Sequence, residues 1–188
     1  MTPIDILTRE HRVILQVLSC MEAMAAEAES AGRLDAEAAR QATSFLREFA
    51  DRSHHGKEEE RLFPMLEANG MPEEGGPTGV MRMEHDAGRA LVTTMVAQID
   101  AAADGAGDAL QAFNKACRDF VTLLRDHIDK EDHCLFPMAE RALGHQGMEE
   151  LGRAFDQVQA EYGDAIKVTY LKVAESLAHR YGVEVVAY

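Results

Sequence analysis

Two near-identical segments of the sequence combine histidine and glutamate at helical spacing. His54 begins the segment HHGKEEERLFP and His127 begins HIDKEDHCLFP, and both fit the pattern H-x-x-K-E-[ED]-x-x-L-F-P. Glu58 and Glu131 therefore each follow a histidine by one helical turn, which places imidazole and carboxylate on one face of a helix. A neutral imidazole and a carboxylate placed in this way can bind the same metal ion.

Two single histidines repeat with almost the same offset. His11 stands in REH and His85 in MEH, and the step from one to the other nearly equals the step from His54 to His127. Such internal repetition predicts two helical hairpins that face each other with matching chemistry, as in a bundle with pseudo-twofold symmetry. Six residues would then converge as metal ligands: His11, His54, Glu58, His85, His127 and Glu131.

Four imidazoles and two carboxylates suit a pair of metal ions. If both glutamates bridge, each metal receives two histidines and two carboxylate oxygens, and positions stay open for a bridging oxygen and an exogenous ligand. Mixed nitrogen and oxygen ligands with open positions favour iron. We therefore predict two non-haem iron ions, bridged by carboxylates and an oxo or hydroxo group. The E-x-x-H motif of ferritin-like bundles and the H-E-x-x-H motif of zinc proteases are absent from the chain.

Glycine and proline divide the chain into long segments without strand-like alternation, which predicts an all-α protein. The expected helices cover residues 3–30, 35–69, 79–104, 108–143 and 148–181. The first four carry inward-facing stripes of apolar residues, and each stripe includes one histidine. We expect residues 1–146 to form a four-helix bundle. Residues 147–188 are expected to form an additional helix and tail that pack on the bundle or at a homodimer interface.

Composition limits the partners and the compartment. The formal net charge of −14 argues against nucleic acid and anionic membranes as partners, because both need a basic surface. No apolar run approaches the length of a membrane span, and the first residues are too charged for a secretory signal. Three scattered cysteines, Cys20, Cys117 and Cys134, are typical of reduced thiols. We expect a cytoplasmic protein.

The remaining polar residues near the motifs have less specific expectations. His55 lies about 100° around the helix from His54, so we expect it on the surface or beside the ligands rather than among them. Cys134 is expected to face the bundle near the metals, where packing is a commoner role for a thiol than redox chemistry. The residues expected in solvent are Glu59, Glu60, His133, His145 and His179; Lys57 and Lys130 are either exposed or paired with a carboxylate beside the site.

The order of a lone histidine, H-x-x-x-E, a second lone histidine and a second H-x-x-x-E, with two L-F-P tails, resembles the hemerythrin-like (HHE cation-binding) family. The resemblance covers residues 4–143. It implies an up-down-up-down antiparallel four-helix bundle that holds non-haem di-iron. The fifth histidine of oxygen-carrying hemerythrins is missing, because Arg89 and Met81 stand at the positions one helical turn after and before His85. Asp132 also fits the last ligand position, but the internal repeat favours Glu131.

The ligand pattern is closer to bacterial hemerythrin-like and repair-of-iron-centres proteins than to oxygen carriers. The function that this resemblance implies is binding of, or reaction with, a small diatomic ligand or oxidant such as O2, NO or peroxide. Two alternatives stay open: an iron store or donor for the repair of iron–sulfur centres, and a di-iron redox enzyme that reduces peroxide or NO.

Overall fold

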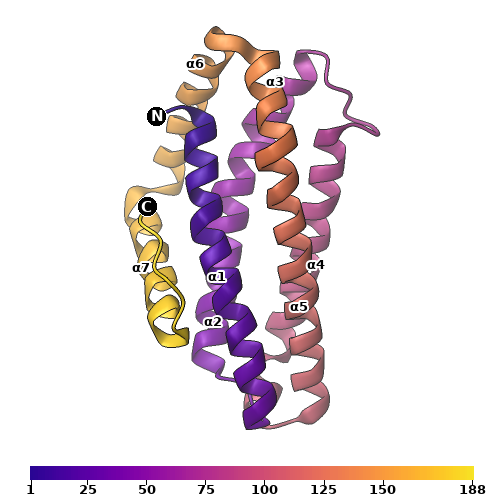
Figure 1. The fold of residues 1–188 in the computed structure, drawn as a ribbon, viewed down its shortest axis with the longest axis vertical. Coiled ribbons are helices and arrows are strands. Elements are labelled where there is room, and N and C mark those ends of the chain that lie inside the picture. The colour runs from indigo at the N-terminus through magenta and orange to yellow at the C-terminus, as the bar shows by residue number, and fades with distance from the viewer.

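The computed structural model covers residues 1–188 and is helical throughout, without strands. Its elements are α1 (Pro3–Ala31), α2 (Ala36–Phe45), η1 (Leu46–His55), η2 (Glu58–Leu62), α3 (Phe63–Ala68), α4 (Pro77–Ala103), α5 (Gly107–Lys130), η3 (Glu131–Leu135), α6 (Phe136–Tyr162) and α7 (Asp164–Tyr181). The rods α1, α2–α3, α4 and α5 lie side by side, with α6 and α7 on one flank (Figure 1). The expected all-α bundle is confirmed.

Local sequence explains where the first helices begin and end. Thr2 and Asp5 form a capping box at the start of α1: the Asp5 backbone N–H donates to the Thr2 hydroxyl, and the Thr2 N–H donates to the Asp5 carboxylate. Gly32 ends α1 in the left-handed conformation, with φ of 69°, which glycine adopts without steric cost. Asp35 then caps α2 by accepting from the Ala38 N–H at 3.0 Å.

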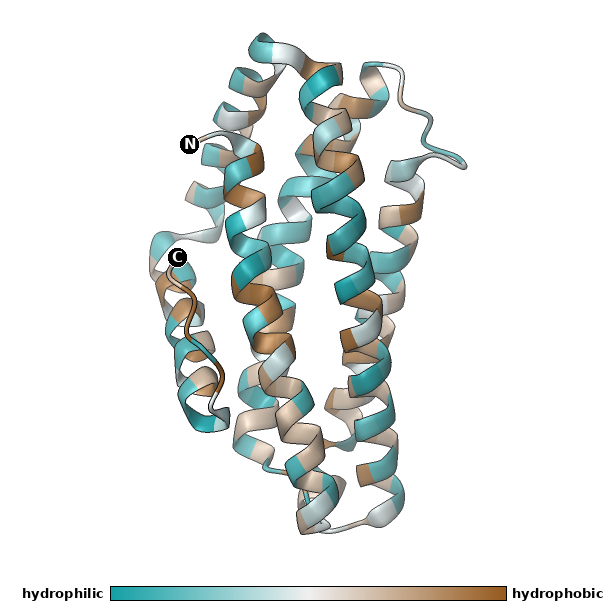
Figure 2. Cartoon of the chain, in the orientation of Figure 1, coloured by the Kyte–Doolittle hydropathy of each residue, from teal (hydrophilic) through white to brown (hydrophobic).

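The interior of the bundle holds two apolar clusters. The larger, of 33 buried residues, fills the end where α1 meets α2 and α4 meets α5; it includes Phe45, Phe49 and Phe113. The smaller, of 11 residues, lies at the other end and includes Phe63 and Phe136 of the two L-F-P tails. Hydrophobic and hydrophilic residues alternate in bands along the rods, as amphipathic helices require (Figure 2). Between the two clusters lies a buried layer of histidines and glutamates.

Three segments of the rods are π-helical, and they coincide with the repeated motifs. The segment η1 ends at His55, η2 begins at Glu58, and η3 begins at Glu131. A π-turn bonds residue i to i+5 and so carries more residues per turn than an α-helix. The rotation between neighbouring residues is therefore smaller than an α-helical count predicts. This change of register decides which side chains face the buried layer.

The C-terminal part differs from the expected single helix over 148–181. Gly144 forms a kink inside α6 instead of a loop, and Gly163, with φ of 91°, separates α6 from α7. Leu151 and Phe155 of α6 join the smaller apolar cluster. Ala174 and Leu177 of α7 join the larger one, and α7 packs against α1 and α2. No helix of the chain is long and apolar enough to cross a lipid bilayer.

Candidate metal centre

The structure brings all six sequence-predicted residues into the buried layer, one or two from each rod. α1 supplies His11, α4 supplies His85, the α2–α3 rod supplies His54 and Glu58, and α5–η3 supplies His127 and Glu131. None of the six is more than 1% exposed. Burying this many titratable side chains costs free energy unless each is paired or bound to a metal ion.

The inward-facing atoms lie at the separations that metal ligands need. The Nε2 atoms of His11 and His127 lie 3.2 and 3.3 Å from the same carboxylate oxygen of Glu131. The two oxygens of Glu58 divide between the pairs: one is 3.5 Å from His54 Nε2, the other 3.6 Å from His85 Nε2. Two ligands about 2.1 Å from one ion at a right angle are about 3 Å apart, which is close to these separations.

Each of these four histidines donates from its outer nitrogen, Nδ1, to a carboxylate. The four Nδ1–carboxylate pairs and their distances are His11–Asp132 (2.8 Å), His54–Glu10 (3.1 Å), His85–Glu59 (2.6 Å) and His127–Glu84 (2.9 Å). A carboxylate that accepts from Nδ1 fixes the tautomer with a free lone pair on Nε2, which is the arrangement found around metal-binding histidines. These outer pairs also follow the internal repeat, since Glu10 and Glu84 directly precede His11 and His85, while Glu59 and Asp132 directly follow Glu58 and Glu131.

The two lysines of the motifs complete this outer layer, with different burial. Lys57 is 1% exposed and donates to Glu10 at 2.9 Å, to the Ser53 carbonyl at 3.2 Å and to the Ser53 hydroxyl at 3.1 Å. Lys130 is only half-buried and donates to Glu84. Two residues from the C-terminal part reach the same buried Glu10 carboxylate, Tyr188 through its hydroxyl and Lys167 through its ammonium group.

Several inward atoms have no hydrogen-bond partner within the protein. They are Nε2 of His11 and both carboxylate oxygens of Glu58 and of Glu131. Buried polar atoms without partners are rare in folded proteins, and an unpaired buried carboxylate costs more free energy than an unpaired neutral group. A cation between the four histidines and two glutamates would satisfy all of them. The residues present therefore fit a metal centre, and two overlapping groups that share Glu58 each bring potential ligand atoms within 4.8 Å of one another.

The pKa values of the two carboxylates in the layer are shifted in opposite directions. Burial raises the pKa of Glu58 well above its usual value, and the negative charge of Glu131 adds to the shift. For Glu131, burial is outweighed by His127 and His11, which hold its pKa well below the usual range. Burial also opposes the charged form of His11, but the hydrogen bond to Asp132 and the nearby carboxylate of Glu131 outweigh it and raise its pKa to about 9. Without a cation, Glu58 therefore holds a proton more strongly than Glu131 does.

The structure decides one expectation for the neighbouring residues and overturns two others. Of the two places expected for His55, it takes the one beside the ligands: it is buried, with its ring stacked on His85, because the π-helical turn rotates it less far from His54 than an α-helix would. Glu59 is hydrogen-bonded to His85 instead of being free in solvent. Cys134 is exposed and does not face the bundle, because the π-turn of η3 changes the register after Glu131.

Other neighbours lie where they were expected or resolve an open alternative. Asp132 contacts the outer nitrogen of His11, so Glu131 alone of the two acidic residues faces the layer. The expected solvent exposure of His133, His145 and His179 is found. Sequence reasoning missed Glu10 and Glu84, although the Glu-His pair that recurs in both halves of the chain is a signal that could have identified them.

Comparison with known proteins gives a consistent picture. The family model for the hemerythrin HHE cation-binding domain matches residues 2–139. Proteins named iron-sulfur cluster repair protein YtfE, from Yersinia pestis strain Pestoides F and Yersinia pseudotuberculosis strain IP 31758, are each 38% identical over 90 residues. That match covers 47% of this chain and 41% of each relative, so it spans less than half of those proteins. No solved structure shows significant similarity. The extent of the family match, together with the histidine and glutamate layer, shows that the chain belongs to the hemerythrin HHE cation-binding family.

Proposed function

We propose that this protein holds two iron ions, one between His11 and His54 and the other between His85 and His127, with Glu58 and Glu131 shared between them. The observation that carries the proposal is the unpartnered set of inward atoms, enclosed by four histidines whose outer nitrogens all donate to carboxylates. The outer carboxylates fix each ring and raise its basicity toward a metal. The iron pair, when bound, supplies open coordination positions and reversible one-electron redox chemistry.

We further propose that a small diatomic ligand or oxidant is what the site takes up. A cavity of about 190 Å³ leads to the layer beside His85 and is lined partly by apolar side chains, among them Val92, Phe120 and Leu124. Its size suits a molecule of a few atoms rather than a metabolite. Apolar clusters on both sides of the layer limit the entry of water by other routes.

Absorption spectroscopy of the iron-loaded protein tests this function. The reduced protein should gain a visible or near-ultraviolet charge-transfer band after exposure to O2, NO or peroxide. His54→Ala, which removes one inward nitrogen, should lose iron and the band, while His145→Ala, at an exposed position, should retain both. An iron-loaded protein whose spectrum does not respond to any of the three ligands would contradict the proposal.

A second candidate is an iron donor for the repair of iron–sulfur centres. It is favoured by the names of the Yersinia relatives, which extend well beyond the matched region. In this role the iron is cargo, so it should move to an apo iron–sulfur protein under anaerobic conditions within minutes. Protein that keeps its iron in the presence of an apo acceptor would exclude the donor role and leave ligand binding or redox catalysis.

In our proposal, residues 147–188 cover the bundle of residues 1–146 instead of forming a homodimer interface. Tyr188 and Lys167 support this assignment, because both reach the buried Glu10 that orients His54. We also infer a reducing, cytoplasmic location from the three cysteines, none of which is paired in the structure.

A further inference from the structure

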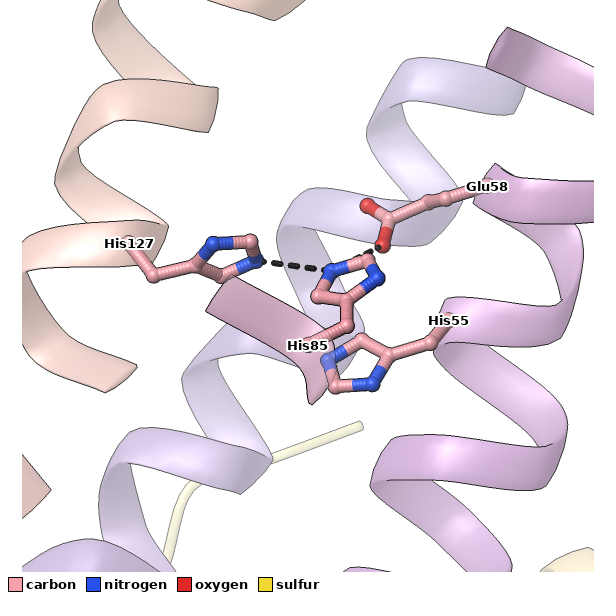
Figure 3. Close-up of side chains that lie close together, drawn as sticks. All are labelled: His55, Glu58, His85 and His127. Atoms are coloured by element: carbon pink, nitrogen blue, oxygen red, sulfur yellow. Dashed lines mark hydrogen bonds and ion pairs between the residues drawn. The ribbon is translucent and has the colours of Figure 1, made fainter. Parts of the chain in front are cut away.

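The buried layer contains a fifth histidine that the pseudo-symmetry of the bundle does not account for. His55 is 7% exposed, and one of its ring nitrogens lies within 4.8 Å of potential ligand atoms of Glu58, His85 and His127. These four side chains converge from η1, η2, α4 and α5 (Figure 3). The corresponding group on the other side, formed by His11, His54, Glu58 and Glu131, contains two histidines, whereas this group contains three.

The outer nitrogen of His55 is arranged like those of the other four histidines. Its Nδ1 lies 3.3 Å from the carboxylate of Asp51, which is also held by Arg89 at 2.9 Å. Because a carboxylate only accepts hydrogen bonds, Nδ1 carries the proton and Nε2 keeps its lone pair. An imidazole in this state is ready to bind a metal ion and need not lose a proton first.

The internal repeat shows that this histidine is specific to one half of the bundle. His55 directly follows His54, and the residue that directly follows the related His127 is Ile128. Ile128 is 4% exposed and belongs to the larger apolar cluster. At this position of the repeat, the first half of the chain therefore has an imidazole, which can bind a metal ion, and the second half has a hydrocarbon side chain.

The ring of His55 must turn before it can bind the same metal as His85. The two rings are stacked, with centroids 3.7 Å apart and 14° between their planes. A metal ion lies in the plane of each imidazole that binds it, so parallel rings cannot share one ion. His55 and His85 both line the cavity of about 190 Å³, which leaves room for His55 to rotate out of the stack.

We propose that His55 is a third histidine ligand for the metal ion held by His85 and His127, so that the two metal ions of this centre have unequal ligand sets. The inference rests on the proposed two-iron site and adds to it which ion has the extra nitrogen. With His55 bound, the ion beside the cavity has three histidines and the ion beside His11 has two.

Mössbauer spectroscopy of the full chain loaded with ⁵⁷Fe tests this assignment. Unequal ligand sets predict two quadrupole doublets of equal area for the wild-type protein. His55→Ile gives both halves the same residue and should bring the two doublets together, with a weakening of at least about tenfold in the affinity of one of the two iron equivalents. Ile128→Leu is the matched control at the related position and should leave both doublets and both affinities unchanged.

The outcomes separate this inference from the function on which it rests. A wild-type protein with two equivalent irons, or a His55→Ile protein that keeps two distinct doublets and both affinities, would overturn the role of His55 while leaving the two-iron site intact. A wild-type protein that binds no iron would instead overturn the proposed function together with this inference. Even if His55→Ile does not fold, two equivalent irons in the wild-type spectrum would overturn the role of His55.

Discussion

The related carboxylates Glu10 and Glu84 provide a quantitative test of the outer layer. Glu10 accepts hydrogen bonds from His54 Nδ1 and Lys57. Glu84 accepts hydrogen bonds from His127 Nδ1 and Lys130. Their surroundings differ, however, because Glu10 and Lys57 are buried, whereas Glu84 is 18% exposed and Lys130 is 41% exposed. Glu10→Ala and Glu84→Ala should therefore lower the metal affinity by similar factors but lower the free energy of unfolding by different amounts.

The expected magnitudes follow from burial. Glu10→Ala leaves the Lys57 ammonium buried without its counter-charge, which costs about 3–5 kcal/mol of unfolding free energy. Glu84→Ala removes an ion pair near the surface, worth about 0–1 kcal/mol, and a hydrogen bond worth about 0.5–1.5 kcal/mol. For a chain of this size, each kcal/mol lowers Tm by about 2–4 °C. Both variants should lose roughly 10–100-fold in metal affinity, because each frees one histidine from its outer partner.

Urea denaturation in the presence of a chelator measures the stability difference, and competition with a metal indicator measures the affinities. The double variant Glu10→Ala/Lys57→Met should regain most of the lost stability, since it removes the unpaired charge, but should not regain metal affinity. Equal destabilisation by Glu10→Ala and Glu84→Ala would refute the reasoning from burial. Unchanged metal affinity in both variants would refute the role of these carboxylates in orienting the histidines.

Three further predictions concern the inner layer and the cavity. Metal affinity should rise between pH 7 and about 9 and then level off, because the pKa of His11 is raised to about 9 and a protonated imidazole cannot bind metal. Proton release during metal loading at pH 7 measures this effect. A metal affinity that does not depend on pH would contradict it. Glu131→Ala should lose iron, as elemental analysis would detect, whereas retention of two ions would exclude Glu131 as a shared ligand. Gly88 lines the cavity, and a Cβ there would meet only Phe120, at 3.4 Å. Gly88→Ala should accordingly stabilise the helix by about 0.5–1 kcal/mol, and Gly88→Leu should slow NO association in stopped-flow measurements at unchanged iron content; equal rates would show that ligands enter elsewhere.

The internal repeat made much of this centre predictable. A nearly constant offset that relates His11, His54 and Glu58 to their partners in the second half identifies the inward faces of four helices without any knowledge of the fold. Helix boundaries followed from glycine and proline, as at Gly32, where the left-handed conformation ends α1. Patterns that depend on one α-helical turn or on a repeated offset can be recognised in the sequence, because they do not require the tertiary arrangement.

The residues that sequence reasoning misplaced lie mainly in or next to π-helical turns. An α-helical count leaves His55 either on the surface or beside the ligands and turns Cys134 toward the layer, whereas the structure buries His55 beside His85 and exposes Cys134. The local sequence does not predict a π-turn, because the stability of such a turn depends on packing against neighbouring rods. The partners of the outer nitrogens were also hidden, because the contacts of Glu10 with His54 and of Glu59 with His85 join residues from different helices.

Iron stoichiometry tests the central claim most directly. Protein loaded anaerobically with Fe(II) and freed of loosely bound metal should contain two irons per chain by elemental analysis, and the His54→Ala protein should contain fewer. We expect this result because Nε2 of His11 and the carboxylate oxygens of Glu58 and Glu131 are buried without a hydrogen-bond partner in the protein. A folded wild-type chain that retains no iron, or a His54→Ala chain that still retains two irons, would contradict it.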